Sequence, residues 1–191
     1  FEHGGDRRAA LKLCEERYAD GPTGAADLND VQTLTDVGLA RRLAIAGKNT
    51  IAFQRDQNRW LSYTGSHWEA DSGLGAESIG KQISDELWQE LHTVEPVERR
   101  TSRPLISFLK ASASQRIIKA AVGLARSEKL LISHSGEFDA HHFLLNVQNG
   151  TLDLNQRILR PHLASDKITH LAAVMYDPEA ECPLWQQFVL D

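Results

Sequence analysis

A stretch that matches the GxxxxGK pattern of a phosphate-binding loop runs from Gly75 to Lys81. Such a loop works because backbone N–H groups surround the phosphate, the Lys reaches the terminal phosphates, and a following Ser or Thr holds magnesium. Here the next residue is Gln82, and Glu77 would place a negative charge inside the anion site. Ile79 belongs instead to the apolar stripe of a predicted helix. We therefore expect a helix with two glycines near its start rather than a nucleotide site.

Histidines and carboxylates that could bind a divalent metal gather between His134 and His142. Zinc takes such nitrogen and oxygen ligands, but no pair has the HExxH spacing that places two histidines on one helix face. The stretch indicates a connecting loop around a packed Phe138. No GxSxG motif occurs, and Cys14 and Cys182 have no base near them in the sequence. We expect no catalytic, cofactor-binding or metal-binding residue in this chain.

Positive charge is concentrated in residues 99–129, which contain eight Lys and Arg residues and a single acidic residue, Glu128. The formal charge of this segment is +7, between arms of -7 (residues 1–98) and -5 (residues 130–191), so the chain as a whole carries -5. Binding to a nucleic-acid backbone depends on a local basic surface that releases counterions. The acidic total therefore does not exclude it.

Three of these basic residues share the polar face of one predicted helix: Arg116, Lys119 and Arg126. At ~100° per residue they fall within ~80° of one another, away from the apolar side. We predict that this face contacts the phosphate backbone of DNA. A flexible extension of the contact would be formed by Arg99, Arg100 and Arg103. The alternative is ion pairing with the acidic surplus elsewhere in the chain or in a neighbouring subunit, since charge alone does not choose between them.

The elements that position these residues follow from periodicity. Apolar residues at helical spacing and capping residues predict helices over residues 6–19, 35–47, 76–92, 105–111, 112–129 and 183–190. A break near Ser112 is expected because Lys110 would lie on the apolar side of a continuous helix. The spacing from Ser112 to Gln115 matches a capping box for the helix that follows.

Between the helices, alternating aromatic residues predict a small antiparallel meander over residues 51–70. Trp60 and Trp68 could stack on bases, but aromatics in such a meander are more typical of a core. The Asn149-Gly150 dipeptide predicts a hairpin with a type I′ turn, and further strands are expected over residues 158–160 and 168–176. The predicted fold class is α+β, with helices packed on small antiparallel sheets and hairpins and with a basic amphipathic helix.

The length of 191 residues fits one domain with an appendage. Residues 1–34, which include a Gly/Pro/Asp-rich stretch over 20–30, are expected to be the tail of an upstream domain plus a linker, and residues 35–191 the domain itself. The absence of an initiating Met indicates a piece of a longer protein. No apolar run reaches the roughly 18 residues of a membrane span. The two cysteines lack CxxC spacing, which favours a reducing cytosol.

Several segments, taken in their order along the chain, resemble a known family: TDVGLARRLA, NRWLSYTGSHWEAD, RIIKAAVGLARSE, EFDAHHFLLNVQNGTLDLNQRILRPH and DKITHLAAVMYDPEAECPLWQQFV. Together they cover about Thr35 to Leu190 and are similar to the domain that precedes the helicase in phage and plasmid primases and in poxvirus-type primase-helicases. The LNVQNGTLDL and YDPEAECP segments are the most specific.

The resemblance implies a module that links a primase portion to a superfamily three helicase, an ATPase that acts as a hexameric ring. It implies DNA, single-stranded or at a fork, and the protein's own primase and helicase domains as partners, in the cytoplasm of a bacterial host. ATP and magnesium would belong to the helicase domain, and no cofactor to this chain. The alternative function is an oligomerisation collar that does not bind DNA. A nucleotide- or metal-dependent hydrolase is a distant third.

Overall fold

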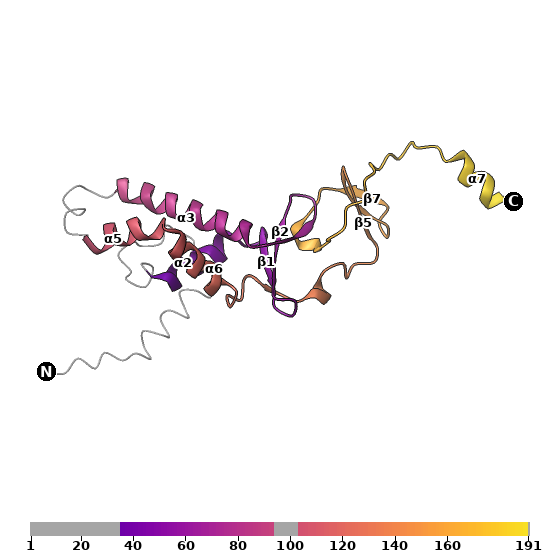
Figure 1. The fold of residues 1–191 in the computed structure, drawn as a ribbon. Helices are drawn as coiled ribbons and strands as arrows, with labels where there is room; N and C mark the ends of the chain where they lie inside the picture. The colour runs from indigo at the N-terminus through magenta and orange to yellow at the C-terminus, as the bar shows by residue number, and fades with distance from the viewer. Residues whose placement is uncertain (1–34, 94–102, 191) are drawn as a thin grey trace.

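The computed structural model describes residues 35–93 and 103–190. A group of helices packs against a four-stranded sheet, a three-stranded sheet lies beyond it, and a terminal helix projects at the far end (Figure 1). The predicted α+β class is confirmed. The helix predicted over residues 6–19 and the stretch over residues 20–30 lie outside the described residues.

Helix α2 (Asp36–Ala46) forms as its caps predict. The Thr35 hydroxyl accepts a hydrogen bond from the Gly38 N–H at 3.1 Å, which satisfies one of the free donors at the helix start. Gly47 ends the helix, and its N–H donates to the Leu43 carbonyl. Leu39 and Leu43 lie on the buried face, so α2 contributes an apolar stripe to the core.

The predicted meander is confirmed as strands β1 (Ile51–Gln54), β2 (Arg59–Tyr63) and β3 (Trp68–Asp71). A two-residue strand, β4 (Ile132–Ser133), adds to the other side of β1 in parallel, so the sheet order is β3-β2-β1-β4. The sheet is therefore mixed, because β4 adds a parallel pairing to the predicted antiparallel meander. Two residues carry no periodicity, and only long-range pairing makes them a strand.

Helix α3 (Leu74–Thr93) starts where Asp71 caps it. One carboxylate oxygen of Asp71 accepts from the N–H groups of Gly73 and Leu74, and the other from the Gly75 N–H and the Ser62 hydroxyl. Burial by itself raises the pKa of Asp71, but the hydrogen bonds from Ser62 and from the three N–H groups outweigh it and hold the pKa below its usual value. Gly75 is required because a Cβ there would lie 2.4 Å from the Ser62 Oγ.

Helices α5 (Arg103–Ser112) and α6 (Gln115–Ala125) are separate, which confirms the break near Ser112. The cap of α6 is Ser114, whose hydroxyl accepts from the Ile117 N–H, so the predicted capping box at Ser112 is wrong. Ser112 is the last residue of α5 and is buried. The helix also stops at Ala125 rather than near Lys129, because the chain turns there toward β4.

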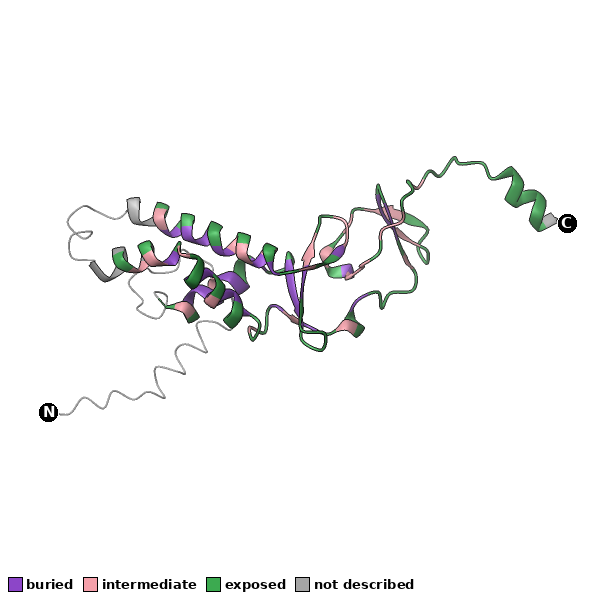
Figure 2. Ribbon diagram, viewed as in Figure 1, coloured by how far each residue is buried: buried purple, intermediate pink, exposed green. Residues whose placement is uncertain are grey.

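The main core lies between α2, α3, α6 and the inner face of the four-stranded sheet (Figure 2). Phe53 and Trp60 meet edge to face in this core, with ring centroids 5.1 Å apart. Helices α3 and α6 approach closely at Gly80, where a Cβ would lie 3.1 Å from Ile118. Close packing therefore explains why glycine occupies both glycine positions of the GxxxxGK match, Gly75 and Gly80.

The second sheet consists of β5 (Leu144–Val147), β6 (Gly150–Asp153) and β7 (Ile158–Arg160), all antiparallel. The predicted hairpin exists, but its two-residue loop is Gln148-Asn149, and Gly150 pairs with Val147 inside the ladder. The assignment of Asn149-Gly150 to a type I′ turn is therefore wrong. Gly150 has a φ of 154°, and a Cβ there would lie 2.5 Å from the Arg160 carbonyl oxygen.

Residues 168–176 do not form the predicted strand. Their hydrogen bonds are divided between the two sheets: the Trp68 N–H donates to the Ile168 carbonyl, and the Ala172 N–H donates to the Asn146 carbonyl. One isolated parallel bridge, Val147 to Ala172, is the result. The segment ties the sheets together instead of extending either.

A terminal helix, α7 (Pro183–Leu190), is present as predicted and lies away from the other elements (Figure 1). Within residues 35–93 and 103–190, no helix is long and apolar enough to cross a membrane.

Candidate nucleic-acid interface

Helix α6 carries the basic face that the sequence predicts. Its buried side is formed by Ile117, Ile118, Ala121, Val122 and Ala125. This side packs on α2 and α3, so the opposite side of the helix faces solvent. Arg116 and Lys119 lie on that opposite side and are exposed.

Neither Arg116 nor Lys119 pairs with a carboxylate among the residues that the structure describes. The ion pairs found there lie elsewhere, between Arg160 and Asp166 and between Lys167 and Glu137. The positive charge of α6 is thus not neutralised by the described part of the chain.

Arg126 differs from the other two. It is the C-cap residue of α6, where a cation interacts favourably with the negative end of the helix dipole. Its guanidinium carbon lies 5.3 Å from the centroid of the Phe53 ring, within the range of a cation–π interaction. The side chain is nonetheless exposed, so Arg126 has a structural contact and an outward-facing charge at once.

Gly123 lies on the same exposed face, one turn after Lys119. A Cβ at Gly123 would meet no atom within 4 Å, and its φ is not in the left-handed region. A glycine inside a helix costs about 1 kcal/mol relative to alanine. Neither packing nor backbone conformation explains this residue, and its absence of a side chain leaves the helix backbone accessible between basic residues.

The predicted extension is only partly visible. Arg99 and Arg100 lie outside the described residues, and Arg103 is the first residue of α5, with a side chain that is not described. Lys110, at the end of α5, and Lys129, after α6, are exposed. Lys110 and Lys129 are close to α6 in the sequence, so they add two positive charges to the same segment.

Trp60 and Trp68 do not serve as stacking platforms in this structure, because both are core residues with about 3% and 4% of their surface exposed. The Trp68 indole N–H donates to the Ala164 carbonyl at 2.8 Å. The preference for a core role is confirmed.

The other two candidate sites have structural explanations. Gly75 to Lys81 lie inside the first turns of α3 and form no loop. Between His134 and His142, Glu137 accepts from the His134 N–H and pairs with Lys167, which lowers the pKa of Glu137. Asp139 accepts from the N–H and the hydroxyl of Thr169. No group of three metal-ligating side chains occurs among the described residues.

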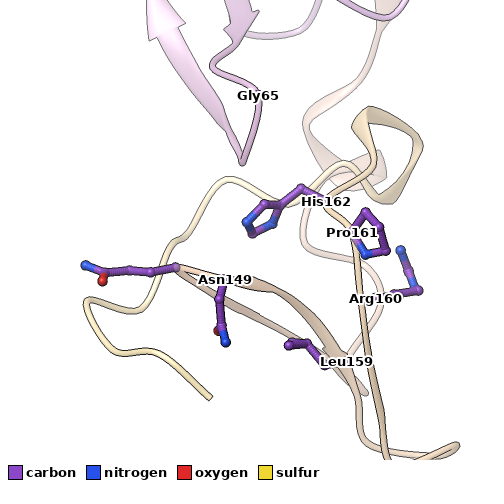
Figure 3. A pocket seen from close by; sticks show the side chains of 7 residues that line it. Gly65, Asn149, Leu159, Arg160, Pro161 and His162 are labelled. Atoms are coloured by element: carbon purple, nitrogen blue, oxygen red, sulfur yellow. The ribbon is translucent and has the colours of Figure 1, made fainter. Parts of the chain in front are cut away.

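A shallow hollow of about 530 Å³ lies beside the second sheet, between the β2–β3 turn and β7 (Figure 3). Most polar side chains that line it already make hydrogen bonds to other residues of the chain. Arg160 makes two hydrogen bonds to Asp166, and the Asn149 amide exchanges two hydrogen bonds with the Tyr176 backbone. His162 Nδ1 lies 2.7 Å from the Asn146 side-chain oxygen. Sequence reasoning missed this hollow because its residues meet only through tertiary pairing.

The Asn146 amide determines which ring nitrogen of His162 donates to it. Its nitrogen donates to the Ser66 carbonyl at 2.8 Å, so its oxygen is the atom that faces Thr151 and His162. His162 Nδ1 must therefore carry the proton in order to donate. The buried His162 Nε2 has no hydrogen-bond partner within the described part of the chain. This polar network joins the second sheet to the β2–β3 turn of the first.

Comparison with known proteins agrees with the resemblance. A family model described as D5 N terminal like matches residues 39–191, most of the chain. No curated protein matches this chain. The match includes the four-stranded sheet, the basic helix α6, the second sheet and α7. The chain therefore belongs to the D5 N-terminal-like family, a replication module of primase-helicase proteins.

Proposed function

We propose that this domain contacts the phosphate backbone of DNA through the exposed basic face of α6, within a replication protein in which it links a primase portion to a hexameric superfamily three helicase. The observation that carries the proposal is the pair Arg116 and Lys119, exposed on α6 and without a carboxylate partner in the described residues. Arg126 extends this face at the end of the helix.

The arrangement suits backbone contact rather than base recognition. Cations spaced along one helix face can meet successive phosphates, and such contacts position a protein without reading sequence. The described aromatic side chains near the face, Phe53 and Trp60, are buried and unavailable for stacking. The expected binding is therefore independent of sequence and sensitive to salt. ATP and magnesium chemistry belongs, in this proposal, to the helicase and not to this domain.

The first test replaces Arg116 and Lys119 together by Glu and measures DNA binding by fluorescence anisotropy over a range of salt concentrations. In the single variants Arg116→Gln and Lys119→Gln, the one lost phosphate contact should reduce the slope of log K against log salt by ~0.9 on duplex or ~0.7 on single-stranded DNA. The double reversal should abolish measurable binding. Arg126→Gln is tested separately, because Arg126 also packs on Phe53.

A matched control reverses Lys48 and Lys81, two exposed lysines outside α6. It changes the net charge by the same amount, so a general charge effect would weaken DNA binding equally in both variants. Unchanged binding in the Arg116/Lys119 variant, or equal loss in the two variants, would contradict the proposal.

The same unpaired cations also support the competing function, a collar in which α6 meets an acidic surface of a neighbouring subunit. Residues 130–191 carry a net charge of -5 and could supply that surface. If the collar is correct, the Arg116/Lys119 reversal lowers the oligomer mass by light scattering, and DNA binding is absent from the wild type.

A further inference from the structure

The turn that follows α6 brings two cations to strand β1. Arg126 ends the helix and Lys129 follows within the turn, and both side chains are exposed. Two residues later, the Leu131 carbonyl accepts a hydrogen bond from the Phe53 N–H at 2.7 Å. The connection from α6 to β4 therefore reaches β1 at Phe53 (Figure 1).

Phe53 points to the helix side of the first sheet. Its ring packs in the main core against Trp60, and the Arg126 guanidinium carbon lies 5.3 Å from the ring centroid. Arg126 is therefore on the helix side of the sheet, beside β1. Because side chains alternate along a strand, Gln54 points to the opposite side.

Arg55 continues β1 on the same side as Phe53. Its N–H donates to the Ser133 carbonyl at 3.0 Å, as the Phe53 N–H does to the Leu131 carbonyl, so the parallel pairing with β4 extends to Arg55. Residues two apart in a strand share a face and are separated by roughly 6–7 Å. Arg55 is exposed, and it thus lies beyond Phe53 on the side of the sheet where Arg126 lies.

Three cations therefore gather at one end of β1: Arg55, Arg126 and Lys129. We call them the strand-end cluster. None of the three pairs with a carboxylate among residues 35–93 and 103–190, where the ion pairs join other residues. Sequence reasoning missed the cluster because Arg55 is more than seventy residues away from the basic segment that supplies its neighbours.

Two acids are adjacent to the strand-end cluster in the sequence, Asp56 and Glu128. The Asp56 carboxylate accepts hydrogen bonds from the N–H and the hydroxyl of Ser135, so it is directed toward that residue. Glu128 is partly buried and makes no ion pair with any residue that the structure describes. The cluster thus has no anion of the described chain bound to it.

Cations that gather without a bound acid repel one another, and an anion placed among them removes this repulsion. Arginine binds phosphate oxygens through two parallel N–H groups, and lysine binds them as a point charge. The Phe53 ring also orients the Arg126 guanidinium before any ligand arrives. A backbone phosphate is the anion that these side chains suit.

From these observations we infer that the DNA strand on α6 continues past the end of the helix, and that one of its phosphates binds between Arg55 and Arg126, beside Lys129. The inference rests on the proposed function, since it extends the same contact from the helix to the sheet. Arg116 and Arg126 are ten residues apart, about 15 Å along the helix. The strand-end cluster is therefore a second contact, separate from Arg116 and Lys119.

Arg59 provides a matched control for Arg55. It flanks the same β1–β2 turn, is exposed and carries the same charge. Its Nε donates to the Gln54 Oε1 at 2.6 Å, which places it on the side of the sheet opposite to Phe53. A strand that crosses the helix side of the sheet should contact Arg55 and not Arg59.

The test measures binding of the 191-residue chain to a fluorescein-labelled single-stranded oligonucleotide by fluorescence anisotropy at several salt concentrations. Arg55→Gln should lower the affinity about fivefold near 0.1 M salt and reduce the slope of log K against log salt by ~0.7, the values for one phosphate contact. Arg55→Lys should restore most of the affinity, because it keeps the charge. Arg59→Gln should leave both quantities unchanged. Circular dichroism checks that each variant is folded.

Arg116→Gln, measured in parallel, separates this inference from the proposed function. If Arg116→Gln reduces the slope and Arg55→Gln does not, the strand does not reach β1 and the inference is overturned alone. Equal losses in Arg55→Gln and Arg59→Gln would also overturn it, as a general charge effect. A reduced slope in Arg55→Gln but not in Arg116→Gln would contradict the α6 contact instead. A wild type without DNA affinity would contradict both.

Discussion

At the scale of residues, several short signals in the sequence correspond directly to contacts. Thr35 caps α2 and Gly47 ends it, because capping depends on neighbours within one turn. Ser112 shows where such reasoning fails. The residue type was right for a cap, but Ser114, two residues later, has the extended backbone and accepts from Ile117. A local sequence pattern does not tell which of two serines separated by one residue caps the helix.

Gly123 permits a residue-scale prediction that follows from the proposed DNA contact. Gly123→Ala should raise the free energy of unfolding by about 0.5–1 kcal/mol, because alanine is the better helix former and its methyl group meets no atom. The same methyl group should weaken DNA binding, since it blocks close approach of a phosphate to the helix backbone. Urea denaturation and fluorescence anisotropy measure the two effects.

The prediction is specific because the substitution should raise stability and lower DNA affinity at the same time. A gain in stability with unchanged DNA affinity would show that Gly123 is not part of the contact, and would leave the role of Arg116 and Lys119 untouched. Ala120→Gly, on the same helix, provides the reverse substitution and should lower stability without improving DNA binding.

At the scale of elements, the apolar periodicity of α2, α3, α6 and α7 was sufficient to predict them. Periodicity did not reveal β4, which is two residues long and exists only through its pairing with β1. It also overestimated residues 168–176, which alternate like a strand but bond to two different sheets. A strand depends on a continuous partner, and the partner is not encoded locally.

The start of α3 gives an element-scale prediction. Asp71→Ala should lower the free energy of unfolding by about 1–2 kcal/mol at pH 7, because three backbone N–H groups and the Ser62 hydroxyl lose their acceptor. The folded-state pKa of Asp71 is lowered, so its stabilising effect is complete above the unfolded pKa of about 3.9 and is lost as the pH falls through the folded pKa.

Denaturation of both proteins between pH 7 and pH 3 tests this prediction, since the difference between wild type and variant should shrink toward the acid end. Asp85→Ala removes an exposed carboxylate from the same helix and should stay within about 0.5 kcal/mol of the wild type. A pH-independent difference for Asp71→Ala would contradict the assigned role of its charge.

At the scale of the whole molecule, Asn146 is the buried polar residue that connects the two sheets. Its amide bonds to the Ser66 carbonyl, the Thr151 hydroxyl and the His162 ring. Asn146→Ala should cost about 1–3 kcal/mol, because buried partners are left without hydrogen bonds. In this variant, backbone amide hydrogen exchange should be faster in both the β2–β3 turn and the second sheet.

Asn155→Ala, in the exposed β6–β7 turn, is the matched control for this change and should alter neither stability nor exchange measurably. Faster exchange in the second sheet alone, with the β2–β3 turn unaffected, would show that Asn146 does not couple the two sheets.

Local pattern and composition were enough to predict the helices, the meander and the concentration of positive charge in residues 99–129. They also carried the resemblance to the family, which the comparison then confirmed. These depend on periodicity, caps and segment identity, which adjacent residues encode. Folding was needed to show that Arg116 and Lys119 lack carboxylate partners in the described chain and that Trp60 and Trp68 are core residues. Pairing and burial depend on residues far apart in the chain, and only folding brings those residues together.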